Sequence, residues 1–190
     1  LLDAALAVGF EQVSFQLEPI AAALDYERRL TRDATVLVVD IGGGTSDFTV
    51  VRLGPQHMAK TDRSGDVLAT TGVHIGGTDF DHKLSLDNVM PLLGYRHLGP
   101  QGHGHHIAHE VELAKIRCSQ SGGDTEVDLS CIERALTAPM AATDMAAQLH
   151  ALLARVVACA RDCVAQAGLS ASGLDAVYLT GGSSALRPFQ

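Results

Sequence analysis

The segment VLVVDIGGGTSDFTVVRL, residues 36–53, combines glycines, carboxylates and a hydroxyl in a pattern that could bind phosphate. Glycines permit positive φ and let backbone N–H groups approach an anion closely. The flanking carboxylates could hold a hydrated magnesium ion, or one of them could orient an attacking water. An ordinary hairpin turn fits the segment about equally well, because Asp and Gly are common turn residues. The candidate residues are Asp40, Gly42, Gly43, Gly44, Thr45 and Asp47.

This glycine segment matches neither of two common nucleotide-binding motifs. A P-loop requires GxxxxGK[ST], and no lysine follows these glycines. A dinucleotide-binding motif requires GxGxxG at the start of a helix, whereas Asp47 occupies the last glycine position and a β-rich run follows it. The segment is therefore predicted to be a strand, a glycine turn and a second strand.

Two further glycine pairs have similar surroundings. HIGGTDFD places Gly76 and Gly77 at a predicted helix start, with Thr78 or Asp79 as its expected N-cap. YLTGGSSAL places Gly181 and Gly182 between a predicted strand and a helix start, where backbone donors can meet a ligand. Three glycine turns, each after a strand, indicate a cleft that several loops share.

The segment EVELAKIRCSQ adds polar side chains on one helical face. Glu112, Lys115 and Ser119 have the spacing i, i+3, i+7, so they lie on one side of a helix. A carboxylate and an ammonium on that face could bind ribose hydroxyls. The alternative is a solvated Glu–Lys pair, which is the more common occurrence for an isolated pair.

The elements that must position these residues predict a mixed α/β protein, with a mixed sheet and flanking helices. β-branched and apolar runs predict the strands, and alanine-rich or periodic segments predict the helices. Strands are expected at 13–17, 36–41, 48–53, 67–71 and 125–130 and before the last glycine pair; helices at 2–8, 19–30, 80–93, 109–119 and 141–167; and a loop at 94–106.

The composition excludes several function classes. The chain has 190 residues, of which 46% are hydrophobic, enough for a buried core. A net charge of −8 argues against a protein that binds a nucleic-acid backbone, although backbone N–H groups and a metal can still hold a nucleotide. No apolar run is long enough to cross a membrane, and the first residues lack a signal-peptide pattern. The four cysteines form no CxxC pair, so reduced thiols and a cytoplasmic location are expected.

Histidines and two cysteines form patterns that could suggest metal or redox chemistry. His105 and His109 have i, i+4 spacing near His103 and His106, but no defined ligand set emerges. A solvated loop is therefore the favoured interpretation. Cys159 and Cys163 share a helical face among apolar residues, which favours buried thiols. The stripe of Leu and Val residues along 149–157 is expected to be core.

Taken in order, five segments resemble the heat-shock-70 (DnaK-like) chaperone family of the actin/hexokinase-like ATPase superfamily. They span nearly the whole chain, and their combination is more specific than any one of them. The likeness is nearest to the YegD-like branch, through EPIAAALDYE, VVDIGGGTSD, MPLLG and VYLTGG. The five segments are EPIAAAL, VLVVDIGGGTSDF, VLATTGVHIGGTDFD, ELAKIRCS and VYLTGGSS.

The resemblance implies a role for each motif. The DxGGGTxD hairpin would hold the β- and γ-phosphates of ATP or ADP and, through water, Mg²⁺ at Asp40 and Asp47. The implied catalytic residues are Glu18, Asp40, Thr45 and Asp47. The implied nucleotide-binding residues are Gly42, Gly43, Gly44, Thr45, Gly76, Gly77, Glu112, Lys115, Ser119, Gly181, Gly182 and Ser183.

The resemblance also implies an actin-like ATPase lobe whose closure drives a chaperone cycle on a client protein or co-chaperone. The expected parts are the end of a first lobe at 1–35, a second-lobe core at 36–80, a smaller, mainly helical subdomain at 81–140 and a return to the core at 141–190. The family's first phosphate loop has no counterpart here, so the chain is expected to be a fragment that hydrolyses ATP poorly by itself.

Two departures keep alternatives open. In the main chaperone branch, arginines that pack on adenine follow the helix lysine and the final GGS turn, whereas this chain has Ile116 and Ala185. Arg117 and Arg187 are close in sequence, but the spacing does not show that they replace those arginines. A non-hydrolysing scaffold module is therefore a second hypothesis. A sugar kinase of the same superfamily is a third and weaker one.

Overall fold

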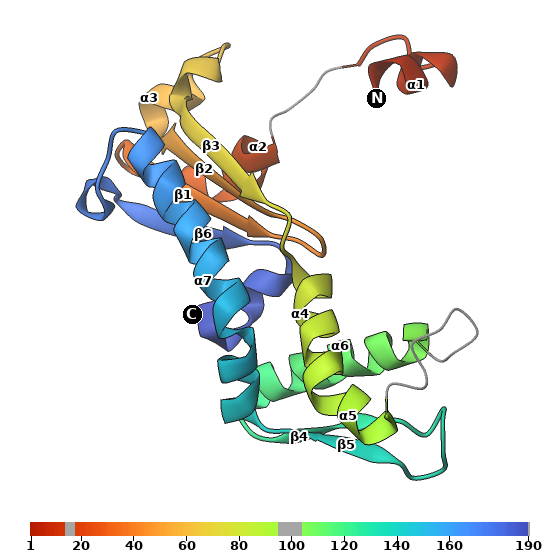
Figure 1. Cartoon of the computed structure of the whole chain (residues 1–190). Coiled ribbons are helices and arrows are strands. Elements are labelled where there is room, and N and C mark those ends of the chain that lie inside the picture. Colours follow the sequence, from red (N-terminus) through yellow and green to blue (C-terminus); the bar gives the residue numbers. More distant parts are fainter. Residues whose placement is uncertain (14–17, 95–103, 190) are drawn as a thin grey trace.

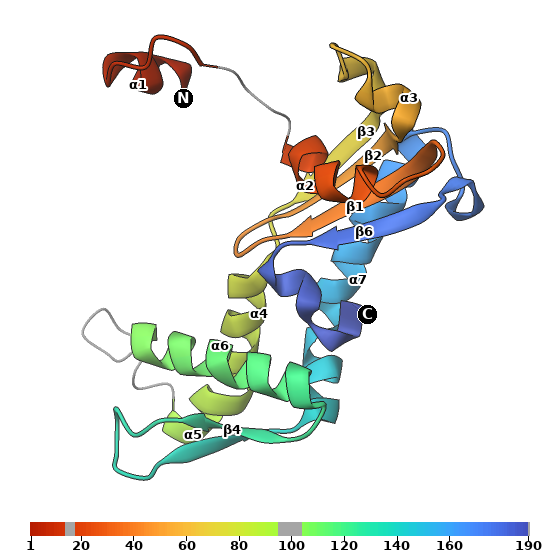
Figure 2. The same ribbon diagram turned by 180° about the vertical axis from the view of Figure 1, so that it is seen from behind.

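The computed structural model describes residues 1–13, 18–94 and 104–189, with the side chains of residues 18–20 outside the description. Figures 1 and 2 show the arrangement from opposite sides. The helices are α1 (Leu2–Ala7), α2 (Glu18–Glu27), α3 (Pro55–Met58), α4 (Gly77–Leu84), α5 (Met90–Leu93), α6 (Gly104–Ser121) and α7 (Ala142–Gln166). The strands are β1 (Ala34–Ile41), β2 (Ser46–Leu53), β3 (Val67–Val73), β4 (Thr125–Asp128), β5 (Thr137–Met140) and β6 (Ala176–Thr180).

A four-stranded mixed sheet forms the upper part of the molecule in Figure 1, in the order β3-β2-β1-β6. β2 is antiparallel to both of its neighbours, and β6 is parallel to β1. Helix α7 covers one face and α2 the other (Figures 1 and 2). The prediction of a mixed α/β protein with flanking helices is confirmed.

Alternate residues of β1 face opposite sides of this sheet. Leu37 and Val39 belong to the core under α7, whereas Val36 and Val38 pack in a second cluster with Ala23 of α2. A strand that is buried on both faces reads as a continuous apolar run, which explains the sequence VLVV.

A second group of elements lies below the sheet in Figure 1. Helix α4 leads down from the sheet to a π-helical segment, Ser85–Val89, and to α5. Helix α6 packs against α4, and β4 and β5 form an antiparallel two-stranded sheet beside it. The core cluster is continuous with that of the upper sheet, because Val111 and Leu129 belong to the same cluster as Leu37.

Several element boundaries differ from the prediction. Helix α6 begins at Gly104 rather than at residue 109, so His105, His106 and His109 lie on its first turns. Strand β5 was not among the predicted strands. Its Pro139 is tolerated because β5 is an edge strand that, in the described part of the chain, pairs with β4 alone. The strand expected at 13–17 and most of the loop expected at 94–106 lie outside the described residues.

A buried charge network joins the end of α2 to the segment between α3 and β3. The side chain of Glu27 is fully buried and accepts two hydrogen bonds from Arg63, at 2.9 and 3.0 Å, and one from the backbone N–H of Gly54. Arg63 also donates to Asp66 at 2.6 Å. The network therefore fixes the C-terminal end of α2 to the sheet.

Asp66 is the second buried carboxylate of this network. Burial raises its pKa, but hydrogen bonds from Lys60, Arg63 and His57 outweigh burial and lower the pKa to about 2. The Asp66 Oδ1 atom lies 2.5 Å from Lys60 Nζ and 2.7 Å from His57 Nδ1. Asp66 therefore stays charged over the whole neutral and mildly acidic range.

The first prediction concerns acid stability. The pKa of Asp66 is lower in the folded protein than in the unfolded chain, so its stabilisation is complete above about pH 4 and is lost as the pH falls toward 2. We expect this carboxyl to account for about 2 kcal/mol of that loss. Urea unfolding at a series of pH values should show a smaller pH dependence for Asp66→Asn than for the unaltered protein.

The matched control is Asp25→Asn, because Asp25 pairs with Arg29 on α2 but its side chain is 69% exposed. An exposed pair contributes little to stability, so this variant should keep the original pH dependence. An equal pH dependence in Asp66→Asn and the unaltered protein would show that the network does not stabilise the fold through Asp66.

Candidate functional site

The hairpin between β1 and β2 places its two aspartates at directly opposite positions. Asp40 and Asp47 are directly paired across the strands, so their side chains leave the same face of the sheet. The turn is closed by a hydrogen bond from Gly42 N–H to Thr45 O at 2.9 Å. The Thr45 hydroxyl donates to Asp47 Oδ2 at 2.9 Å. Two like charges opposite one another repel, which favours a cation beside them.

The start of α4 binds the carbonyl oxygens of this hairpin. The N–H of Gly77 donates to Gly42 O at 2.9 Å, and both the N–H and the hydroxyl of Thr78 donate to Gly43 O at 2.7 Å. The N–H groups of Gly43 and Gly44 have no hydrogen-bond acceptor in the described part of the chain. With the carbonyls held by α4, these N–H groups are available to an anion.

Gly76 permits this close approach. A Cβ atom at Gly76 would lie 2.5 Å from Gly43 O and 2.6 Å from Gly44 N, so a larger residue would push the hairpin away. Gly76 is the N-cap of α4, and its N–H donates to the Asp79 carboxylate at 2.8 Å. The expectation that Thr78 or Asp79 is the N-cap was wrong, because the Thr78 hydroxyl binds the hairpin and Asp79 folds back from the first turn.

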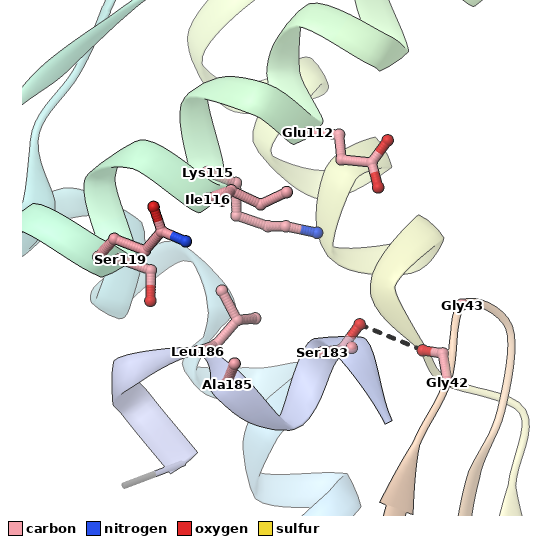
Figure 3. A pocket seen from close by; sticks show the side chains of 11 residues that line it. Gly42, Gly43, Glu112, Lys115, Ile116, Ser119, Ser183, Ala185 and Leu186 are labelled. Carbon is pink, nitrogen blue, oxygen red and sulfur yellow. Dashed lines mark hydrogen bonds between the residues drawn. The ribbon is translucent and has the colours of Figure 1, made fainter. Parts of the chain in front are cut away.

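The last glycine turn approaches the hairpin from the β6 side. Gly181 has φ +81°, and a Cβ atom there would lie 2.4 Å from Ile41 O and 2.5 Å from Asp40 Oδ1. After this turn, the Ser183 hydroxyl donates to Gly42 O at 3.2 Å (Figure 3). The turn thus packs directly on the residues that lead into the glycine segment.

Helix α6 contributes the face that the spacing of its polar residues predicted. Lys115 is nearly buried, and its ammonium lies 2.7 Å from Asp81 Oδ1 on α4. The Ser119 hydroxyl accepts a hydrogen bond from the backbone N–H of Arg187 at 2.9 Å. The Glu112 side chain is half-exposed, and its Oε2 atom lies 3.8 Å from His109 Nδ1. The alternative of a solvated Glu–Lys pair is wrong, because Lys115 pairs with Asp81 instead.

These elements enclose a pocket of about 430 Å³. Figure 3 shows Lys115 and Ile116 of α6 on one side and Ala185 and Leu186 on the opposite side, with the hairpin at one end. The pocket is lined by Gly42, Gly43, Glu112, Lys115, Ile116, Ser119, Gln120, Gly182, Ser183, Ala185 and Leu186. Seven of these residues are candidates from the sequence.

The other candidates have different positions. Asp40, Thr45 and Asp47 lie on the hairpin beside the pocket rather than in its lining, as does Gly44. Gly76, Gly77 and Gly181 provide backbone contacts to that hairpin. Glu18 is the first residue of α2, and its side chain is outside the description, so its catalytic role stays a prediction.

Sequence reasoning did not name Asp81, Gln120 or Leu186, and it considered Thr78 only as a helix N-cap. Thr78 and Asp81 both belong to the motif GGTDFD, directly after the glycine pair. Their spacing from Gly77 places them on the first turns of α4, but only the packing of α4 against α6 shows which partners they have.

One side of the pocket has an apolar lining. Ile116, Ala185 and Leu186 form it, and the arginines next to them in sequence point to other partners. Arg117 Nη2 donates to Glu126 O at 3.0 Å, and the Arg187 guanidinium lies against Gly122 at the end of α6. Neither arginine is among the residues that line the pocket, so this side of the pocket is aliphatic.

The other candidate patterns show no further site. Among the described residues, no three or more His, Cys, Asp or Glu side chains are grouped so that they could hold a metal ion, and His103 is outside that part. Cys163 is buried and Cys159 half-buried against the sheet, and both are free thiols. No helix in the described ranges is long and apolar enough to span a membrane.

The fold and the pocket define an α/β protein with a ligand pocket at the glycine turns of its central sheet. The family model described as "Hsp70 protein" matches residues 1–188. A curated relative, "Chaperone protein dnaK" of Cyanidioschyzon merolae (strain NIES-3377 / 10D), is 30% identical over 198 residues, covering 99% of this chain and 31% of that protein. The chain belongs to the Hsp70 family. It spans about a third of the length of this relative.

The second prediction tests the close approach at the last glycine turn. Gly181→Ala should destabilise the protein by about 2–4 kcal/mol, because the added Cβ would meet Ile41 O and the residue has a positive φ. Gly182→Ala is the matched control, since nothing lies within 4 Å of a Cβ at that position. Chemical denaturation of both variants measures the difference; equal stabilities would contradict the described packing.

Proposed function

We propose that this protein is the nucleotide-binding lobe of an Hsp70-type chaperone and that it binds ATP or ADP with magnesium. The observation that carries the proposal is the pocket itself. One cavity is lined by residues of the first and last glycine turns and of α6, which come from three distant parts of the sequence. Each of them carries a motif to which the family resemblance gives a nucleotide contact.

The residues present fit a nucleotide. A volume of about 430 Å³ is in the range of small-ligand sites, and the Gly43 and Gly44 N–H groups at the hairpin suit phosphate oxygens. Lys115 and Ser119 on α6 suit ribose hydroxyls, and the apolar side with Ile116 suits a base. These positions support phosphates at the hairpin and the nucleoside between α6 and the last turn.

The two carboxylates of the hairpin also fit magnesium. Asp40 and Asp47 present carboxylate oxygens from directly paired positions, and oxygen ligands are those that Mg²⁺ prefers. The ion would be held through its water molecules, and it would neutralise charge on the phosphates. The Thr45 hydroxyl orients the Asp47 carboxylate through its Oδ2 atom.

In a longer protein with a second lobe, we propose that the bound ATP is hydrolysed and that the nucleotide state controls lobe closure. Asp40, Thr45 and Asp47 would position the phosphates and the attacking water, with Glu18 nearby. Lobe closure would couple to a client protein or co-chaperone in the cytoplasm. Membership of the YegD-like branch and the fragment nature of the chain are parts of the same proposal.

The third prediction tests the magnesium and phosphate site by calorimetry. The full-length protein should bind Mg-ATP, and Asp40→Ala should weaken binding by roughly tenfold or more, because a carboxylate that holds the hydrated ion is lost. When EDTA removes magnesium, the difference between the two proteins should become small.

The control for this experiment is Asp162→Ala, since Asp162 is exposed on α7. This variant should bind Mg-ATP like the unaltered protein. Absence of Mg-ATP binding by the unaltered full-length protein would reject the proposed function. An unchanged affinity in Asp40→Ala would reject the role of Asp40 alone.

A second candidate is a binding module that holds nucleotide without turnover. It is favoured by the apolar side of the pocket, where Ile116 and Ala185 provide no cation for the base. The fourth prediction separates the two candidates: an ATPase shows steady release of phosphate from ATP that is lost in Thr45→Ala. Binding without any phosphate release would favour the module, and ADP release that depends on an added sugar would indicate a kinase.

A further inference from the structure

The Asp81–Lys115 pair connects the two helices that meet at the pocket. Asp81 lies on the second turn of α4, and Lys115 lies on α6 and lines the pocket. Their side chains are 10% and 5% exposed, and the Lys115 Nζ and Asp81 Oδ1 atoms are 2.7 Å apart. The pair is therefore a buried contact at the wall of the ligand site.

The ammonium of Lys115 has two partners on α4. Besides Asp81, it lies 3.4 Å from the backbone oxygen of Gly77. Asp81 Oδ1 is buried, and the Lys115 ammonium at 2.7 Å is the partner in the described residues that compensates its charge. An ammonium has three donors, and the one that does not face α4 is the donor available to the pocket.

A buried ammonium needs a counter-charge. Removing one partner of a buried ion pair leaves an uncompensated charge, which is strongly unfavourable. Burial raises the pKa of Asp81, while Lys115 acts in the opposite direction and Glu112 adds to the rise. Asp81 thus allows Lys115 to remain in the pocket wall instead of turning toward solvent.

Helix α4 also holds the β1–β2 hairpin. Gly77, whose carbonyl faces Lys115, donates its own N–H to Gly42 O, and Thr78 donates twice to Gly43 O. Helix α4 therefore contacts the hairpin through Gly77 and Thr78, and it contacts Lys115 of α6 through Asp81.

We propose that Asp81 is a positioning residue: it holds the Lys115 ammonium so that its free donor meets a ribose hydroxyl of the bound nucleoside. This inference rests on the proposed function, since it needs a nucleoside between α6 and the last turn. Asp81 touches neither the ligand nor the phosphates. It acts through Lys115, and it fixes that lysine relative to the helix that holds the hairpin.

The test is a double-mutant cycle on the full-length protein, with adenosine and Mg-ADP as separate ligands in calorimetry. Asp81→Asn keeps the shape of the side chain but removes its charge. It should weaken binding of both ligands by the same factor, roughly tenfold, because a charge-assisted contact to the ribose is lost. Lys115→Met should cause a similar loss, and the double variant should bind no more weakly than Lys115→Met.

A merely structural role of Asp81 would give a different pattern, because its effect would then multiply with that of Lys115→Met. The matched control is Asp87→Asn, which removes the acidic partner of the more exposed pair between Lys83 of α4 and Asp87 of the π-helical segment. It should leave both affinities within about twofold, as expected for a partly exposed pair.

The possible outcomes are distinguishable. If the unaltered protein binds Mg-ADP and adenosine but Asp81→Asn binds them equally well, the inference is overturned and the proposed function stands. If Asp81→Asn binds Mg-ADP more tightly and adenosine unchanged, Lys115 acts on the phosphates and the inference is also overturned. If the unaltered protein binds neither ligand, both the inference and the proposed function fail.

Discussion

The backbone of the β1–β2 hairpin is held by two glycine turns from distant parts of the chain, and the site depends on this contact. Gly76 and Gly181 have no room for a side chain, because backbone oxygens of Gly43 and Ile41 occupy that space. The start of α4 binds the hairpin carbonyls through Gly77 and Thr78. These contacts fix the direction of the hairpin, so its N–H groups and carboxylates keep a defined position beside the pocket.

Buried charges have different uses at the two ends of the sheet. At one end, Glu27, Arg63 and Asp66 join α2 to the segment between α3 and β3, and every carboxylate of this network is hydrogen-bonded. At the other end, the Asp81–Lys115 pair is close but less well satisfied, and it forms part of a ligand pocket. A complete network suits anchoring, whereas a lysine that lines a pocket and has one acidic partner keeps a further N–H donor for a ligand.

Membership of the Hsp70 family and the geometry of the pocket point to the same ligand class. The departures at Ile116 and Ala185 change how a base would be held but not where it would lie, because both residues line the pocket. In the proposed complex, aliphatic contact would take the place of cationic stacking. The proposed alternatives therefore differ in what the protein would do with a nucleotide, and not in where the nucleotide would bind.

The sequence by itself determined the mixed α/β class, most helices and strands, and the motifs of the site, because apolar periodicity and glycine turns are local signals. It could not show the first turn of α6 or strand β5. His and Gly have low helix propensity and Pro disfavours a strand, and tertiary packing accepts them here. Only the tertiary structure decided that Lys115 pairs with Asp81 rather than Glu112, and that Arg117 and Arg187 face away from the pocket. Each of those choices depends on which helix packs beside which, and such long-range contacts leave no periodicity in the sequence.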